Sequence, residues 1–249
     1  MDFELEICVN SIRSALAAQQ GGATRIELCD NMAEGGTSPS AGMIRECIRR
    51  LTIPVFPIIR PRGGDFLYSD EEFAVMKQDI IFCRESGSHG VAIGILKQDG
   101  SIDTERCREL IALARPMQVT FHRAYDRCND LSAGLEDIIS LGCERVLTSG
   151  GQITAAEGIA ELTGLVKQAA NRIIILAGSG VNEENISQIA TQTGIKEFHS
   201  TAKEMTSSAM HYKGVGGLSQ QDGGFPIFET KAEKVFKMKQ ALALIEKAI

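Results

Sequence analysis

The sequence has no surplus of positive charge and no long hydrophobic run. Its lysines and arginines number 26 against 32 aspartates and glutamates, which gives a formal net charge of −6 and a pI near 5.4. Broad nucleic-acid binding favours basic surfaces, so this balance argues against that class and gives no support to an acidic membrane as partner. No apolar stretch approaches the length of a membrane span, and the N-terminal MDFELEICVN lacks the basic and apolar regions of a signal peptide.

Closely spaced cysteine pairs and two common catalytic motifs are missing as well. No CxxC, GxSxG or HExxH sequence occurs, which excludes the usual nucleophile elbow and the helical zinc motif. The cysteine total is odd and the spacing is not that of a disulfide framework, so a reducing cytosol is the simplest compartment. The cysteines stand at positions 8, 29, 47, 83, 107, 128 and 143.

The sequence has instead a regular alternation of short β-branched runs and helical patterns. The runs predict strands at 3–8, 25–29, 54–60, 89–96, 117–122, 144–148, 172–178 and 195–199. The helical patterns fall at 11–20, 39–51, 70–86, 103–115, 131–141, 154–171, 183–193 and 229–248. Two helix starts are marked: Ser38-Pro39 is typical of an N-cap followed by proline, and Ser69 with Glu72 fits a capping box.

This alternation predicts an α/β protein, a (β/α)8 TIM barrel in a single domain that spans residues 1–249. Parallel neighbouring strands need helix-length connections, and eight of them can close into a barrel, which removes both sheet edges. A doubly wound open sheet is the alternative that the pattern leaves open. One long irregular stretch, at about 200–228, is rich in Ser, Gly and Gln, and such a loop is usually functional or mobile.

Side-chain alternation along the strands predicts a polar barrel interior. In the first strand Leu5 and Ile7 share one face, so Glu6 and Cys8 share the other. The apolar face packs on the helices, which leaves the polar face inside. The same reasoning predicts inward side chains for Glu27, Cys29, Arg60, Thr120, His122, Thr148, Glu197 and His199.

Such a set is too polar for a filler core. A buried ionised side chain without a partner costs several kcal/mol or more, so these groups must be paired, bound to a metal or solvated in a pocket. A purely structural ion-pair network is one explanation. We favour a functional site, because barrels of this type carry their sites where the strands end. The residues expected to converge there are Glu6, Glu27, Arg60, His122 and His199.

Several long motifs resemble those of the CutC family, which is named for copper homeostasis. They are LEICVNS (5–11), RIELCDN (25–31), EGGTSPS (34–40), PIIRPRGGDFLYSD (57–70), VTFHRAYD (119–126), RVLTSGG (145–151), AGSGV (177–181) and EFHSTA (197–202). The resemblance covers essentially the whole chain, and it is specific because several motifs occur in the right order. It implies a (β/α)8 barrel, a cytoplasmic location, a homodimer and a link to copper handling, but no known reaction.

One hypothesis for the function is Cu(I) binding. Cu(I) is soft and prefers thiolate or thioether ligands. Cys8 and Cys29 each stand two residues beyond an inward glutamate on neighbouring strands, so their thiols are expected at one level, and the resemblance supports both as ligands. The alternative is that both are small buried hydrophobic residues. The lack of a CxxC or Met-rich motif argues against a dedicated copper chaperone.

The other hypothesis is an enzyme that performs acid–base chemistry, as an isomerase or lyase, on a small anionic molecule such as a phosphorylated one. Carboxylates and imidazoles in a polar pocket commonly transfer protons, so the five convergent residues above become catalytic candidates. Arginine forks bind carboxylate and phosphate, and glycine amides after the last two strands are a usual phosphate site in barrels. The substrate-binding candidates are Arg62, Asp65, Arg123, Thr148, Ser149, Gly178 and Gly180. A scaffold without a small-molecule site would not need these charges.

Overall fold

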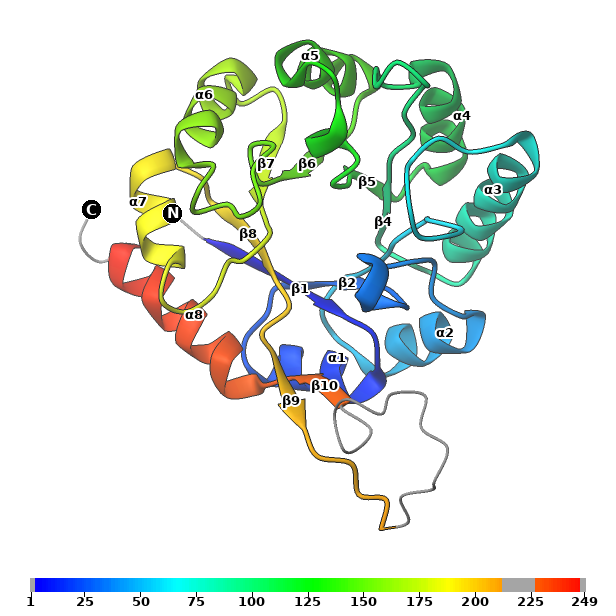
Figure 1. Cartoon of the computed structure of the whole chain (residues 1–249). Coiled ribbons are helices and arrows are strands. Elements are labelled where there is room, and N and C mark those ends of the chain that lie inside the picture. The colour runs from blue at the N-terminus through cyan, green and yellow to red at the C-terminus, as the bar shows by residue number, and fades with distance from the viewer. Residues whose placement is uncertain (1–2, 212–226, 247–249) are drawn as a thin grey trace.

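The computed structural model describes residues 3–211 and 227–246, and its strands form a parallel barrel inside a ring of helices (Figure 1). The barrel strands are β1 (Glu4–Val9), β2 (Arg25–Leu28), β3 (Val55–Pro57), β4 (Gly90–Ile93), β5 (Gln118–Phe121), β6 (Arg145–Thr148), β7 (Ile174–Ala177) and β8 (Glu197–Ser200). The helices around them are α1 (Ile12–Gln20), α2 (Ala41–Arg50), α3 (Asp70–Glu85), α4 (Thr104–Ala114), α5 (Leu131–Leu141), α6 (Ile159–Ala169), α7 (Ile186–Thr193) and α8 (Ala232–Glu246). The predicted (β/α)8 barrel is confirmed.

Neighbouring strands pair in parallel in the order β3-β2-β1-β8-β7-β6-β5-β4. The two ends of this sheet meet just beyond β3, where Ile58 forms a parallel bridge with Ala92 of β4 and the Ile59 N–H donates to the Ala92 carbonyl at 2.8 Å. The sheet therefore closes, and the open-sheet alternative is wrong. None of the helices that the structure describes is long and apolar enough to cross a membrane.

Four helices begin two or more residues later than predicted. Helices α7 and α8 begin at Ile186 and Ala232 rather than at 183 and 229. Helix α2 begins at Ala41 with Ser40 as its N-cap, whereas Ser38 uses its hydroxyl to accept the Arg60 N–H and to donate to Asp79. Helix α6 begins at Ile159, because the chain from 150 to 158 forms a loop. The capping box at Ser69 is present as predicted, and it starts α3.

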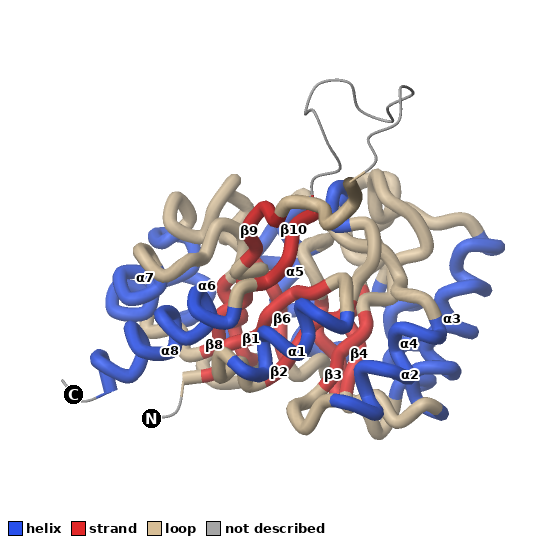
Figure 2. The backbone as a smooth tube through the Cα atoms, turned by 90° about the horizontal axis from the view of Figure 1, so that it is seen from below, coloured by secondary structure: helices blue, strands red, loops and turns tan. Residues whose placement is uncertain are grey.

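The stretch expected to be one irregular loop contains two strands. β9 (Lys203–Thr206) and β10 (Ile227–Thr230) pair antiparallel, and both lie at the end of the barrel where the parallel strands finish (Figure 2). The single-loop prediction for 200–228 is therefore wrong at both of its ends, and its central part, 212–226, lies outside the described residues. The hairpin places Lys203 beside the barrel mouth.

Alternation along the strands separates two packing layers. Leu5, Ile7, Ile26 and Leu28 belong to the large apolar core between barrel and helices. The inner face holds a small separate cluster of Cys8, Cys29, Ile58 and Ala92, together with buried charged groups. Burial of apolar surface in this outer layer stabilises the fold by roughly 25 cal/mol per Å². Because the helices supply this stabilisation from outside, the barrel interior can hold polar side chains.

Candidate functional site

The barrel mouth contains a cavity of about 540 Å³ at the carboxyl ends of the strands. Of the five residues expected to converge, Glu27, Arg60, His122 and His199 line this cavity, and Glu6 lies directly behind His199. The volume falls within the range of small-molecule pockets in proteins. The predicted convergence at one end of the barrel is confirmed for these four residues, whereas Glu6 lies outside the cavity.

The thiols of Cys8 and Cys29 lie 3.3 Å apart on the cavity wall. The sequence analysis expected both cysteines at one level, and this is wrong. Cys8 pairs with Glu27, so Cys29 is two residues further along the chain of β2 than the partner of Cys8. The expectation ignored the stagger between neighbouring strands that closing a barrel requires. The side chains still meet. Gly36, with φ of +93°, lies close to Cys29: a Cβ at Gly36 would be 3.3 Å from Cβ and 3.6 Å from the sulfur of Cys29.

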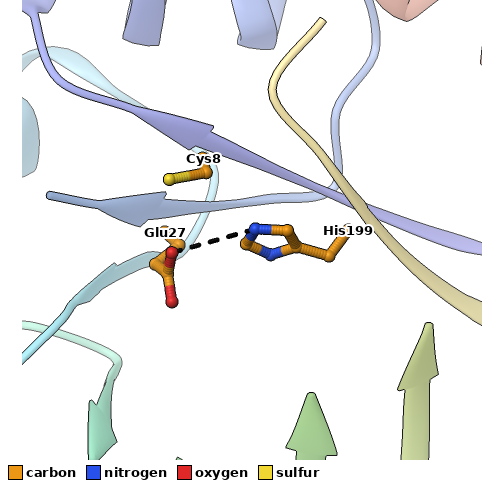
Figure 3. Close-up of side chains that lie close together, drawn as sticks. All are labelled: Cys8, Glu27 and His199. Atoms are coloured by element: carbon orange, nitrogen blue, oxygen red, sulfur yellow. Dashed lines mark ion pairs between the residues drawn. The ribbon is translucent and has the colours of Figure 1, made fainter. Parts of the chain in front are cut away.

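A carboxylate and an imidazole complete a cluster of donor atoms around Cys8. The Cys8 sulfur, a Glu27 carboxylate oxygen and a ring nitrogen of His199 all lie within 4.8 Å of one another (Figure 3). Nε2 of His199 is 3.9 Å from Oε2 of Glu27. The three residues come from β1, β2 and β8, which are adjacent in the sheet. Together with Cys29, the cluster offers two sulfur donors, one nitrogen and one oxygen.

Glu6 fixes the orientation of His199. Nδ1 of His199 donates to Oε1 of Glu6 at 2.7 Å, which leaves Nε2 facing Cys8 and Glu27. Burial alone would raise the pKa of Glu6, but the Arg25 guanidinium and the His199 hydrogen bond hold it well below its ordinary value. Metal-binding histidines usually donate their second ring N–H to such a carboxylate. Glu6 therefore orients His199 and does not line the cavity itself.

The charges within the cluster are coupled to one another. Burial raises the pKa of Glu27. Burial would lower the pKa of His199, but its hydrogen bond to Glu6 and the carboxylate charges of Glu27 and Glu6 raise it. The hydrogen bond with Cys29, reinforced by burial, raises the pKa of Cys8 well above its ordinary value. The thiol at Cys8 is consequently protonated at neutral pH.

Below the cavity lies a buried ion network that the sequence analysis missed in part. Arg25 donates to Glu6 and, at 2.8 Å, to Glu197, and Arg145 contacts Glu197 at 3.3 Å. Both guanidinium groups also lie over the Phe56 ring, at 5.2 and 5.4 Å. Alternation could have found Arg25, which is two residues before the inward Glu27. These charges thus form a structural ion-pair network, one of the explanations considered for the polar barrel interior. The residues that line the cavity lie above this network.

In β6 the predicted inward residue was wrong. Leu147 lines the cavity and Arg145 lies inside the barrel, so Thr148 points the other way. The Thr148 hydroxyl donates to Asp126 at 2.5 Å. Ser149 is also buried outside the cavity, where its N–H and hydroxyl both donate to Asp126. These two candidates shape the loop after β6 and do not face a ligand.

Arg60 lines the cavity, but its guanidinium is largely occupied by the protein itself. It donates to the main-chain carbonyls of Glu34, Gly36 and Gly64 at 2.7–2.8 Å, and only 4% of the residue is exposed. Arg60 thereby joins the loops after β2 and β3. Its Nε has no hydrogen-bond acceptor in the described part of the chain.

His122 stands beside Arg60 on the cavity wall. Its Nδ1 accepts the Ala124 N–H at 3.2 Å, which places the ring proton on Nε2. Burial, with the Arg60 charge, lowers the pKa of His122 to about 3. The ring is therefore neutral at physiological pH, and with so low a pKa it is a weak proton acceptor.

Arg62 and Asp65 do not reach the cavity. Arg62 forms ion pairs with Glu72 of α3 at 2.6 Å and with Asp65 at 3.0 Å, and it donates to the Leu67 carbonyl. These contacts anchor the loop after β3 to the start of α3. The structure therefore contradicts their placement in a substrate site, because the chain turns outward immediately after Arg60.

Three other candidates lie at the rim. Arg123 lines the cavity and pairs with Asp126 at 2.7 Å. Gly180 also lines it, with φ of +70°. Gly178 is not a lining residue. A Cβ there would lie 2.5 Å from Leu147 and 3.2 Å from Cβ of His199, so glycine makes room chiefly for the Leu147 side chain.

The sequence and the structure of this chain are similar to those of known proteins, and the similar regions include this site. The sequence profile of the CutC family matches residues 3–204. A family protein CutC of Chromobacterium violaceum is 46% identical over 245 residues, 97% of this chain and 99% of the relative. The copper homeostasis protein cutC homolog of Homo sapiens is 46% identical over 211 residues, 85% of this chain and 77% of the relative. A solved structure of a CutC protein from Streptococcus agalactiae matches with a TM-score of 0.77 at 35% identity, over 80% of this chain and 98% of that one.

Proposed function

This chain belongs to the CutC family, and on that basis we propose that it binds Cu(I) in the barrel mouth as a copper homeostasis protein. The observation that carries the proposal is the pair of thiols at Cys8 and Cys29, 3.3 Å apart and accessible from the cavity. The human relative is named for copper homeostasis. That name supports a copper ligand here, and the thiol pair supplies a chemical reason for it.

The donor set suits a soft cation. Thiolates select Cu(I), and imidazole is compatible with copper and zinc alike. Cys8 and Cys29 would be the principal ligands and Nε2 of His199 a third, because Glu6 holds that nitrogen toward the sulfur. Glu27 is the harder donor, and its raised pKa favours the neutral carboxyl form. Binding would release the thiol proton of Cys8, so affinity should rise with pH.

The test is Cu(I) affinity of a Cys8→Ser/Cys29→Ser double variant, measured by competition with a chromogenic Cu(I) chelator. We expect affinity to fall by more than about tenfold, since serine hydroxyls do not replace thiolates for Cu(I). The melting temperature should stay near that of the wild type, because the cavity is open on one side of both residues. Cys128→Ser, at a half-buried position away from the cavity, is the matched control.

Two results would contradict the proposal. Unchanged Cu(I) affinity in the double variant would remove these thiols from the site. Preferential retention of Zn(II) over Cu(I) in a competition would show that the sulfur, nitrogen and oxygen donors serve a zinc centre instead.

We also propose that the protein is cytoplasmic and forms a homodimer. All seven cysteines are free thiols, including a pair at 3.3 Å, which suits a reducing compartment. The homodimer rests on resemblance to the family. Size-exclusion chromatography with light scattering tests it.

A further inference from the structure

Arg60 places a buried positive charge on the cavity wall. Arg60 is 4% exposed, yet within the described residues no carboxylate lies within 4.0 Å of its guanidinium. Its partners are neutral: three carbonyls and the face of Phe66, 5.0 Å away. One buried donor, Nε, has no hydrogen-bond acceptor among the residues that the structure describes. A buried charge without a partner of opposite sign is costly, so this arrangement points to an anion that completes it.

Two more cations stand at the rim of the same cavity. Lys203 of β9 lines it and has no carboxylate partner in the part of the chain that the structure describes. Arg123 pairs with Asp126 through Nε and donates to the Ser149 hydroxyl through one terminal nitrogen. Its other terminal nitrogen has no partner within residues 3–211 and 227–246. The cavity is thus lined by three cations and one carboxyl group, that of Glu27, in a protein whose net charge is −6. Such a contrast concentrates anions at the mouth.

A stretch of main chain with N–H groups that are unpaired in the described part of the structure lines the cavity together with these cations. Ser179, Gly180 and Val181 line it in the loop after β7, and none of their N–H groups has an acceptor among the described residues. Ser179 and Gly180 both have positive φ, +77° and +70°. Consecutive amides in this conformation form anion-binding concavities, and the loops after the last two strands are where barrels usually bind phosphate.

We propose that the cavity binds a small organic molecule through its carboxylate or phosphate group, held by the Ser179–Val181 amides, Lys203 and Arg123. The long-range field of Arg60 adds to this attraction from the wall. A cavity of about 540 Å³ has room for the body of such a molecule beside the thiol cluster, which a single metal ion would not fill. This site does not depend on Cu(I) binding, and the two can be tested separately.

Isothermal titration with ribose 5-phosphate and with citrate tests the proposal, and neutral ribose is the matched control. We expect at least one anion to bind and ribose not to bind. Which anion binds distinguishes a phosphate from a carboxylate ligand.

In Lys203→Met, affinity for the anion should fall about tenfold, the effect of one lost charge-assisted hydrogen bond. Lys97→Met, at an exposed lysine outside the cavity, should bind as the wild type does.

Several outcomes would overturn the proposal. They are no binding of either anion at millimolar concentration, equal binding of ribose, or unchanged affinity in both Lys203→Met and Arg123→Gln. Cu(I) affinity measured in the same variants should remain that of the wild type. A wild-type protein that binds Cu(I) but none of these anions would refute only this site. A wild-type protein that binds an anion but not Cu(I) would refute only the copper proposal.

Discussion

At the residue scale, two histidines on one cavity wall show how surroundings decide protonation. His122 and His199 both lie buried at strand ends. Burial and the charge of Arg60 lower the pKa of His122, whereas two glutamates raise the pKa of His199 against the effect of burial. The same side chain therefore serves as a neutral ring in one place and as a carboxylate-oriented donor in the other.

The buried His122 predicts a specific pH dependence of stability. The unfolded chain protonates this histidine below about pH 6.5, and the folded protein does so only near pH 3. The stabilisation is therefore complete above pH 6.5 and is lost as the pH falls, by about 1.4 kcal/mol per pH unit. Urea unfolding should show that wild-type stability drops by about 2 kcal/mol more than that of His122→Asn between pH 7 and pH 5.

Asparagine is the appropriate replacement because its side-chain oxygen can accept the Ala124 N–H as Nδ1 does. Parallel pH profiles for wild type and variant would show that His122 is not held neutral in the fold.

At the element scale, packing inside the barrel depends on the absence of a side chain on β4. A Cβ at Gly90 would lie 2.1 Å from the Phe56 ring, which is enclosed by Arg25 and Arg145. Gly90→Ala should therefore destabilise the protein by about 1–3 kcal/mol, as overpacking of a filled core does. Chemical denaturation measures this loss.

Gly164 offers the matched control in helix α6. Nothing lies within 4 Å of a Cβ placed there. Gly164→Ala should stabilise the protein by about 0.5–1 kcal/mol, because alanine has the better helix propensity. Equal effects of the two substitutions would show that Phe56 does not constrain β4.

Helix starts show how local signals succeed and fail. The capping box at Ser69 uses only neighbouring residues, and the sequence located it correctly. Ser38-Pro39 carries an equally good local signal, but α2 begins two residues later. The hydroxyl of Ser38 instead bonds to Arg60 and Asp79, which are distant in sequence. A tertiary contact therefore outweighed a local preference.

At the scale of the whole molecule, the buried ion network connects strands across the barrel. Arg25 of β2 bridges Glu6 of β1 and Glu197 of β8, with only 7% of its side chain exposed. Arg25→Met would leave two buried carboxylates without their principal partner. We expect a loss of about 3–5 kcal/mol in the free energy of unfolding, measured with urea.

Arg49→Met is the surface control for this prediction. Arg49 pairs with Glu46 one helical turn away, with 63% of its side chain exposed. Exposed pairs contribute little, so no measurable loss is expected. A similarly small effect of Arg25→Met would mean that the network does not contribute to barrel stability.

The sequence by itself determined the barrel, its element order and the chemistry at the mouth. Alternation at Glu6, Cys8, Glu27 and His199 was sufficient, because a strand has only two faces and the apolar face must meet the helices. The family motifs pointed to the same fold and to the thiols.

Only the tertiary structure decided which of these groups meet. Strand stagger, which is a property of the closed sheet, set Cys8 beside Glu27 and placed Arg25 under Glu6. The path of the loops turned Arg62 away to Glu72 and brought Lys203 to the rim. These outcomes depend on contacts between residues far apart in the chain, and no local pattern encodes those distances.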